Sequence, residues 1–248
     1  MIGTELLLGH VIDSNSSYIG RKLAETGINL YRKTVVGDNK KRAVEALQAA
    51  LSRADVVIIT GGLGPTEDDI TREVVAEVFG LRQIYSEEAV DHASSILRRY
   101  GHRDRESLLG LAKIPENSTL IPNSCGTACG IIVKDNNKHV ICVPGVPKEM
   151  EAMIDQSVIP YLENLEGSNG KGIILSKTIR ICGPGESEVE HKIRHLLHGK
   201  SNPTIAPLAF LGEVMLRITA KAHSKKEANL MIDKVEAELV ECLGSDIY

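Results

Sequence analysis

Apolar residues recur at helical spacing in several segments of the first two-thirds of the chain, and short apolar runs separate these segments. The spacing predicts helices over residues 14–27, 42–51, 66–79, 86–100 and 147–162, with Gly80 and Gly101 ending two of them. The shorter runs predict strands over residues 28–36, 56–60, 119–121, 131–133 and 140–143. Strands that alternate with helices are typical of a parallel sheet covered on both faces. We therefore expect a three-layer α/β domain with a mostly parallel sheet.

The pattern changes at "EGSNGKG", Glu166 to Gly172, a polar and glycine-rich stretch that is typical of a linker. Beyond it the sequence predicts strands over 173–182, 204–210 and 214–220, and helices over 186–197 and 224–243. This β-α-β-β-α order indicates a small α+β domain. The expected organisation is a first domain over 1–165, a linker over 166–171 and a second domain over 172–248.

Composition and charge narrow the classes of partner. Hydrophobic residues make up 42% of the 248 residues and charged residues 25%, which is typical of a soluble globular protein. The net charge of −4 gives no reason to expect a nucleic acid or an anionic membrane as partner. No apolar run reaches the roughly 18–20 residues that span a bilayer. The five cysteines are irregularly spaced, so we expect free thiols and a cytoplasmic location.

The stretch "TGGLGPTEDD", Thr60 to Asp69, lies between a predicted strand and a predicted helix. Ligands of open parallel sheets bind at the carboxyl ends of strands, and glycine lets backbone N–H groups approach an anion closely. A Walker loop is excluded because no lysine occurs in this stretch, and Glu67 occupies the third glycine position of a Rossmann fingerprint. The glycines thus indicate either a phosphate or diphosphate site or a plain strand-to-helix turn.

The acids after the glycines allow two interpretations. Thr66 and Asp69 match a capping box, in which Asp69 would accept a hydrogen bond from the Thr66 N–H. Asp68 is left over, and it would repel a bare phosphate. A divalent cation between carboxylate and phosphate would remove this conflict, because Mg²⁺ is commonly held by one or two carboxylates and substrate phosphates.

Four motifs together closely resemble the CinA family of competence/damage-inducible proteins: "GTELLLGHVIDSNSSYIGRKLAETGI", "VVGDN", "TGGLGPTEDDITREVVAEVFG" and "VPGVPKEM". The resemblance covers Ile2 to about Leu162, a domain similar to the molybdopterin-binding MoaB/MogA fold. The region after Lys171 resembles the KH-like domain of the same family.

The resemblance implies a homodimeric pyrophosphatase that hydrolyses ADP-ribose, or a related nucleoside diphosphate sugar, to AMP and ribose 5-phosphate. The implied cofactors are a divalent metal (Mg, Mn or Co) and possibly K⁺. It implies catalytic roles for Asp68, Asp69 and Asp38, and metal binding by Asp68 and Asp38. The implied substrate-binding residues are Thr4, Glu5, Asn15, Gly61, Gly62, Leu63, Gly64, Thr66, Asn123, Gly126, Thr127, Gly145, Val146, Pro147, Glu149 and Met150.

The chain departs from the family pattern in three places. The family usually has a full β-strand before "GTEL", whereas this chain begins at "MIGTELL", so the sheet is expected to lack that strand. Cys129 stands where the family usually has proline. The chain stops at "GSDIY", whereas many members continue into an amidase domain that acts on nicotinamide nucleotides, so we do not predict the amidase for this chain.

Two alternatives concern binding rather than catalysis. The second domain carries "CGPGES" and lacks the GxxG loop of a nucleic-acid-clamping KH domain, so it is expected to mediate interaction or dimerisation. The MoaB-like fold of the first domain would also suit a non-catalytic binder of a molybdopterin-like phosphorylated pterin.

Overall fold

The computed structural model of the chain describes residues 1–99, 105–165, 173–197, 201–210 and 212–248. Contacts divide it into two compact units, the first of Met1–Lys22 and Tyr31–Leu162, the second of Leu23–Leu30 and Glu163–Tyr248. The linker expected over 166–171 and the helix end expected at Gly101 lie outside the described residues.

A four-stranded sheet with the order β1-β6-β5-β4 forms the centre of the first unit. Its strands are β1 (Val56–Thr60), β4 (Thr119–Ile121), β5 (Gly130–Asp135) and β6 (Lys138–Val143). β1 and β6 are parallel, whereas β6 with β5 and β5 with β4 are antiparallel. The sheet is therefore mixed rather than mostly parallel. A two-residue turn explains the difference, because Asn136 adopts the left-handed conformation (φ 51°) that tight hairpins require.

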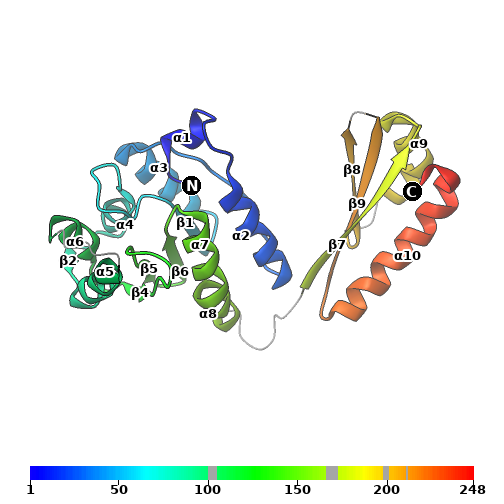
Figure 1. Cartoon of the computed structure of the whole chain (residues 1–248). Helices are drawn as coiled ribbons and strands as arrows, with labels where there is room; N and C mark the ends of the chain where they lie inside the picture. Colours follow the sequence, from blue (N-terminus) through cyan, green and yellow to red (C-terminus); the bar gives the residue numbers. More distant parts are fainter. Residues whose placement is uncertain (100–104, 166–172, 198–200, 211) are drawn as a thin grey trace. The chain divides into compact units, whose positions relative to one another are not determined.

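Helices cover both faces of this sheet, as expected for a three-layer α/β unit (Figure 1). One layer contains α3 (Lys40–Leu51) and α4 (Thr71–Phe79). The other contains α7 (Pro147–Met153), a π-helical turn (Ile154–Val158) and α8 (Ile159–Leu165), with α2 (Ser14–Glu25) alongside. Alternate residues of β6 serve the two layers: Val140 and Cys142 pack in the core with α3 and α4, whereas His139 contacts Tyr161 of α8.

Three further helices and a strand pair complete the described part of the first unit. They are α1 (Thr4–Leu7), α5 (Glu87–Arg99), α6 (Arg105–Ala112) and the strand pair β2 (Gln83–Tyr85) and β3 (Lys113–Pro115). The pattern of the sequence did not indicate α1, α6 or this strand pair. The strands and α1 have only three or four residues, which are too few to establish a period.

The strand predicted over 28–36 does not form. Leu30 and Tyr31 are exposed (41% and 85%), so the apolar alternation that suggested a strand has no buried side. Only Val36 forms a bridge, which is parallel to Ile2. Ile2 N–H also donates to the Thr60 carbonyl (3.0 Å). Met1–Gly3 thus lie between β1 and Val36, the place where the missing strand was expected.

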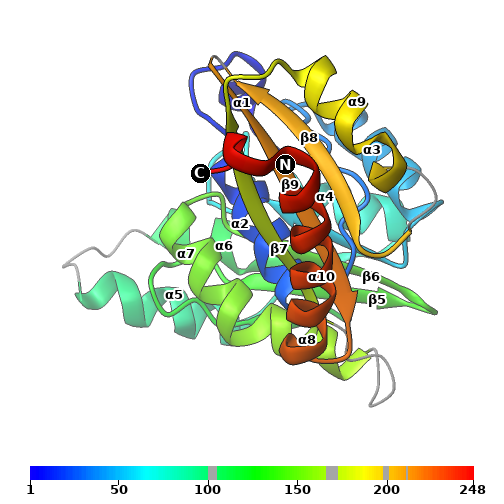
Figure 2. The same ribbon diagram turned by 90° about the vertical axis from the view of Figure 1, so that its right-hand side faces the viewer.

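The second unit is an antiparallel sheet with the order β7-β9-β8, covered on one face by two helices (Figure 2). The elements are β7 (Ile173–Cys182), α9 (Glu186–Leu197), β8 (Thr204–Phe210), β9 (Glu213–Ala222) and α10 (Lys225–Leu243). Ile181, Ile193, Leu216, Ile218 and Leu239 are almost fully buried between sheet and helices. The predicted β-α-β-β-α order is confirmed.

Two expectations from composition can be compared with the structure. All five cysteines are free thiols, as expected. Among the described helices, none combines the length and apolar character that a membrane span requires.

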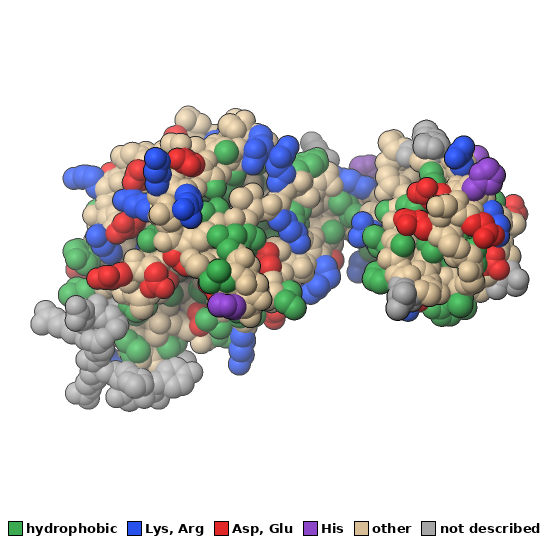
Figure 3. Space-filling model, turned by 90° about the horizontal axis from the view of Figure 1, so that it is seen from above, with side chains coloured by type: hydrophobic (Ala, Val, Ile, Leu, Met, Phe, Trp, Pro, Cys, Tyr) green, Lys and Arg blue, Asp and Glu red, His purple; other side chains and the backbone are tan. Residues whose placement is uncertain are grey.

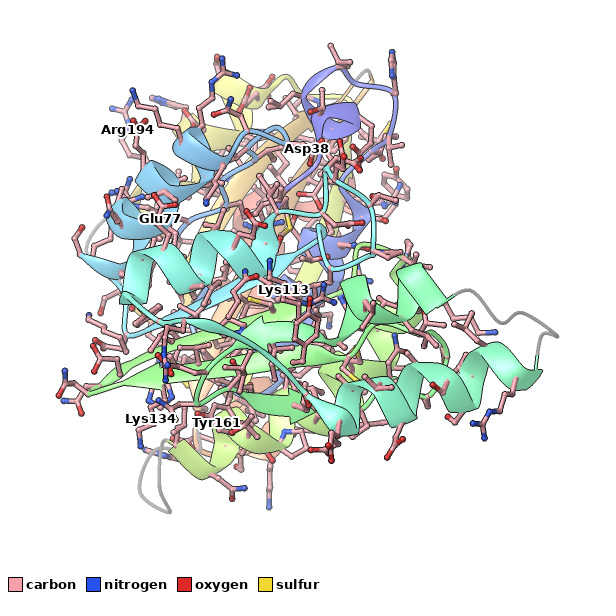
Figure 4. The ribbon with its side chains drawn as sticks, turned by 90° about the vertical axis from the view of Figure 1, so that its left-hand side faces the viewer. Asp38, Glu77, Lys113, Lys134, Tyr161 and Arg194 are labelled. Carbon is pink, nitrogen blue, oxygen red and sulfur yellow. The ribbon has the colours of Figure 1, made fainter. Side chains whose placement is uncertain are left out.

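His139 provides a pH-dependent contribution to the stability of the first unit. Its side chain is only 7% exposed, and its Nδ1 lies 2.7 Å from the Tyr161 hydroxyl. Tyr161 and Lys134 lie at the end of the unit opposite Asp38 (Figure 4). Burial, and to a lesser degree the Lys134 charge, lowers the pKa of His139 below its ordinary value of 6.5.

The unfolded chain therefore takes up this proton more readily than the folded one, so stability is lost as pH falls below about 6.5. We expect thermal melting between pH 8 and pH 5 to show a falling Tm, and His139→Gln to flatten that fall. His223→Gln, at an exposed position, is the matched control and should retain it. An equal pH dependence in His139→Gln and the native chain would contradict the assignment.

Candidate functional site

A cleft of about 480 Å³ opens in the first unit at the carboxyl ends of β1 and β6. Most of the residues that the sequence predicted for the site line this cleft: Glu5, Asn15, Asp38, Gly61, Gly62, Leu63, Gly64, Asp68, Asp69, Thr127, Gly145, Val146, Pro147 and Glu149. They come from segments far apart in the sequence. The fold therefore brings the four family-like motifs to one place.

Strand register explains this convergence. Thr60, the last residue of β1, is paired with Val143, the last residue of β6, so both strands enter their loops side by side. The Thr60 hydroxyl donates to the Pro144 carbonyl at 2.8 Å. Asn15 Nδ2 donates to the Gly145 carbonyl (2.7 Å) and to the Thr60 hydroxyl (3.1 Å). These hydrogen bonds therefore join the loop after β1, the loop after β6 and the start of α2 beneath the cleft.

The loop that follows β1, Gly61–Gly64, is called the glycine loop below. Its four carbonyl groups all point towards the start of α4. Thr71 accounts for two of them: its hydroxyl donates to the Gly61 carbonyl (2.6 Å) and its N–H to the Gly62 carbonyl (3.1 Å). The Arg72 guanidinium donates to the carbonyls of Leu63 and Gly64. In a trans peptide unit the N–H points opposite to the carbonyl. The N–H groups of Gly62, Leu63 and Gly64 are thus directed away from α4.

These three N–H groups are available to a ligand. Within the part of the chain that the structure describes, no hydrogen bond uses the N–H of Gly62, Leu63 or Gly64, although all three residues line the cleft. Successive unpaired N–H groups form a concave donor surface that suits an anion. The arrangement favours the phosphate interpretation of the loop over the plain turn.

The first two glycines are also required by the fold itself. Gly61 and Gly62 have φ of 99° and 67°, a region that other residues rarely adopt. A Cβ at Gly61 would overlap the Ile2 carbonyl oxygen, and a Cβ at Gly62 would lie 2.5 Å from the Thr71 hydroxyl. Their presence is therefore explained without any ligand.

Asp69 has a structural role, although not the predicted one. Its Oδ2 accepts from the Thr66 N–H (3.0 Å) and from the Thr66 hydroxyl (2.6 Å), as in a capping box. However, α4 begins at Thr71 and not at Thr66, and no side chain caps it at Ile70. Asp69 therefore closes a separate turn between the glycine loop and the helix, which corrects the helix predicted over 66–79.

Asp68 lies beside Asp69 but is exposed. The pKa of its carboxyl lies below the ordinary value because the Thr66 hydroxyl and the backbone N–H of Asp68 stabilise the carboxylate. A hydroxyl donates only one hydrogen bond, and its short bond goes to Asp69. Asp68 therefore gains the weaker share of this stabilisation, and its oxygens face solvent at the cleft.

Asp38, which also lines the cleft, is anchored by Thr4. Asp38 Oδ2 accepts from the Thr4 N–H (2.8 Å), and the Asp38 N–H donates to the Thr4 hydroxyl (3.1 Å). Figure 4 shows Asp38 close to α1, which Thr4 begins. Thr4 does not line the cleft itself and acts by holding Asp38.

Glu149 is held in the same indirect way by Asn123, which is fully buried. Asn123 Nδ2 donates to Glu149 Oε2 (2.7 Å) and to the Ala128 carbonyl (2.9 Å). Its Oδ1 accepts from the N–H groups of Cys125 (3.0 Å) and Gly126 (2.9 Å). Every hydrogen-bonding position of this amide is used, so the loop and the Glu149 carboxylate share one anchor.

The remaining predicted residues lie behind the cleft wall. Thr66, Asn123 and Gly126 contact residues of the cleft but do not line it, and Met150 is fully buried in the core. The sequence missed Val11 and Ile12, which line the cleft and are 52% and 88% exposed. Two adjacent exposed apolar residues inside the first motif were a usable signal.

The donor chemistry suits a hard divalent cation only in part. Asp38 and Asp68 supply carboxylate oxygens on the cleft surface, and the buried Asn15 Oδ1 has no hydrogen-bond partner within the described residues. Yet no three His, Cys, Asp or Glu side chains of the described segments gather into a metal-binding group. This fits an ion of the Mg²⁺ type, which is held by few carboxylates and completes its shell with substrate phosphates and water.

Acidic and basic side chains are interspersed on the face of the first unit drawn in Figure 3, with apolar side chains between them. The cleft is lined by acids and, among the described residues, by no Lys or Arg side chain. Backbone N–H groups, the buried Arg72 beneath the loop and the amino group of Met1, which donates to the Thr34 carbonyl, oppose this negative charge. A bare anion would meet both attraction and repulsion there.

Asn123 offers a test of the anchor. We expect Asn123→Ala to lower the free energy of unfolding by about 1–3 kcal/mol, because several buried partners lose their hydrogen bonds. Urea unfolding measures the loss. The neighbouring Ser124→Ala, at an exposed position, should stay within about 0.5 kcal/mol. Equal stability of both variants would show that Asn123 does not hold the loop.

Two family models match the chain. The model described as "Probable molybdopterin binding domain" matches residues 1–164, and the model described as "Damage-inducible protein CinA KH domain" matches residues 176–248. The boundary between the matches falls close to the boundary between the two compact units.

Curated relatives match over the full chain. A CinA-like protein of Dictyoglomus thermophilum is 47% identical over 247 residues, and a CinA-like protein of Kosmotoga olearia is 43% identical over 247 residues. Each alignment covers 100% of this chain and 59% of the relative. The chain thus spans about three fifths of the length of the curated relatives that it matches.

Among solved structures, the protein CinA of Thermoplasma acidophilum, described as of unknown function, is similar with a TM-score of 0.59 and 36% identity. The similarity covers 66% of this chain and 94% of that one.

Proposed function

This chain belongs to the CinA family, and from that premise we propose that its first unit hydrolyses the diphosphate bond of ADP-ribose or a related nucleoside diphosphate sugar. The products would be AMP and ribose 5-phosphate. One observation carries the proposal: three successive unpaired N–H groups, of Gly62, Leu63 and Gly64, line a cleft that also presents the carboxylates of Asp38 and Asp68.

The loop N–H groups would bind the phosphate oxygens of the substrate, as donors fixed in advance by Thr71 and Arg72. The exposed apolar side chains of Val11, Ile12 and Val146 line the same cleft and supply a surface for the less polar part of a nucleotide. Donors for phosphate beside an apolar wall are what a nucleoside diphosphate requires and inorganic phosphate does not.

Asp38 and Asp68 would hold a divalent ion, and the free Asn15 Oδ1 is a neutral oxygen donor for the same site. When bound, the ion would screen the charge of the diphosphate and lower the pKa of a water molecule. In the reaction the water oxygen bonds to one phosphorus and the bond from that phosphorus to the bridging oxygen breaks. A carboxylate of the cleft, for which we propose Asp69, would accept the proton of the water.

We further propose a homodimer in which the second unit serves interaction rather than nucleic-acid binding. Residues 171–248 carry 11 Lys and Arg against 10 Asp and Glu, which leaves a charge of about +1. Such a balance gives little attraction for a phosphate backbone. A requirement for K⁺ and a cytoplasmic location belong to the same proposal.

A second candidate function is non-catalytic binding of a molybdopterin-like phosphorylated pterin. The match of residues 1–164 to a probable molybdopterin-binding domain favours it. The same loop N–H groups would bind the pterin phosphate. The carboxylates of Asp38 and Asp68 separate the two candidates, because a binder has no need of acids around an anion.

Incubation with ADP-ribose distinguishes these functions. With Mg²⁺, Mn²⁺ or Co²⁺ we expect AMP and ribose 5-phosphate in equal amounts on nucleotide chromatography, and with excess EDTA we expect none. Binding of ADP-ribose without turnover under all three metals would contradict the hydrolase proposal and leave the binder.

Substitution of the two neighbouring aspartates tests the site. Asp68 is exposed, so Asp68→Ala should leave the Tm near the native value while activity falls at least ~100-fold. Asp69→Ala removes both the proposed base and the bonds to Thr66, so it should lower the activity and also the Tm, with a stability loss of about 1 kcal/mol. The measurement is a metal titration of activity with a melting curve for each variant.

Glu67→Ala, an exposed acid of the same stretch that does not line the cleft, is the matched control and should keep both activity and Tm. Full activity and unchanged metal dependence in Asp68→Ala would remove Asp68 from the site and leave Asp38 as the principal metal ligand.

A further inference from the structure

Arg72 is a buried cation in the first turn of α4, with only 4% of its surface exposed. No carboxylate lies within ion-pair distance of it among the described residues, and its Nε is buried without a hydrogen-bond partner. Burying a charge is costly unless it is paired. The position of this side chain therefore requires an explanation beyond packing.

The groups around Arg72 do not neutralise it. Burial raises the pKa of Cys129 to about 11 and that of Cys142 to about 12, so both nearby thiols are uncharged at pH 7. Asp69 acts on the guanidinium electrostatically, but no ion pair joins the two side chains. Burial lowers the pKa of Arg72, yet an arginine retains its proton. A positive charge without an ion-pair partner among the described residues thus lies under the glycine loop.

The same guanidinium fixes two peptide units of the loop. Its Nη2 donates to the Leu63 carbonyl and its Nη1 to the Gly64 carbonyl (3.3 Å). The Leu63 carbonyl and the Gly64 N–H belong to one peptide unit, so holding the carbonyl down directs that N–H away from α4. Because Pro65 follows Gly64, the second carbonyl has no N–H opposite it. Arg72 therefore sets the direction of the last donor of the loop.

We propose that Arg72 is a positioning residue for diphosphate binding, which orients the Gly64 N–H and supplies the positive charge that the acidic cleft surface lacks. The inference rests on the proposed function, since it assumes that the cleft takes a diphosphate. The substrate would not touch the guanidinium. Its charge acts through the Leu63–Gly64 peptide in a poorly solvated region, where an electrostatic interaction is stronger than in water.

Calorimetric titration of the full chain with inorganic pyrophosphate and with ADP-ribose, in EDTA to prevent turnover, tests this role. We expect Arg72→Met to weaken both affinities at least ~10-fold. Arg72→Lys should weaken them as well, because a single ammonium cannot hold both carbonyls in the fork of a guanidinium. The matched control is Arg82→Met, which removes the same charge from an exposed pair with Glu116 and should change neither affinity.

All titrations are made well below the Tm of each variant, so that a stability effect alone leaves the affinity unchanged. Native affinity in folded Arg72→Met, or in folded Arg72→Lys, would overturn the positioning role while the proposed function stands. Failure of the native chain to bind pyrophosphate both in EDTA and with Mg²⁺ would overturn the proposed function and this inference together.

A measurement on the native chain covers the case in which the variants do not fold. In amide and guanidinium NMR spectra, pyrophosphate should shift the N–H signals of Gly62, Leu63 and Gly64, and with them the Nε–H signal of Arg72. If the loop signals shift while the Arg72 Nε–H signal stays unchanged, the guanidinium does not respond to the ligand, and the proposal is overturned.

Discussion

The parallel pairing of β1 with β6 is the constraint on which the rest of the first unit depends. Because Thr60 lies opposite Val143, the glycine loop after β1 and the loop after β6, "PGVP" at residues 144–147, leave the sheet at the same edge. The contacts that close the floor of the cleft, from the Thr60 hydroxyl and from Asn15, are possible only in that register. A slip of one residue would reverse the faces of β1 and separate the loops.

The cleft combines features that oppose one another electrostatically. Backbone N–H groups and a buried guanidinium attract an anion, whereas the carboxylates of Asp38, Asp68 and Asp69 repel it. Such a site stabilises an anion well only when a cation accompanies it, and a cation well only when an anion completes its coordination. Binding of the two is therefore expected to be mutually dependent, with the affinity of each measured low in the absence of the other.

Much of this could be read from the sequence, because the long elements repeat their apolar positions several times. The helices of both units other than α1 and α6, strand β1 and the β-α-β-β-α order of the second unit follow from that repetition. The strand expected over 28–36 does not form, because its apolar residues Leu30 and Tyr31 are both exposed. The start of α4 was predicted five residues too early, because the expected hydrogen bond between Thr66 and Asp69 does form but closes a turn before the helix.

The residues of the candidate site also differ in whether the sequence could indicate them. The glycines and acids belong to recognisable local motifs, so the sequence indicated them, whereas Arg72 belongs to no such motif. In "DITREVVAE" an arginine near a helix start is typical of a solvated position, and only the tertiary structure shows that this one is buried. Val11 and Ile12 were missed for the related reason that exposure of an apolar residue is decided by packing and not by its neighbours in the chain.

The first two glycines of the loop have a further consequence for how related chains diverge. Gly61 is required by the Ile2 carbonyl and Gly62 by Thr71, whether or not a ligand binds. A descendant that lost the proposed activity would still be under selection to keep both. Asp68 is exposed at the cleft, so the fold does not require it, and substitutions would accumulate there soon after the loss. Within the family, the acid after the glycines is therefore a better record of ancestral chemistry than the glycines themselves.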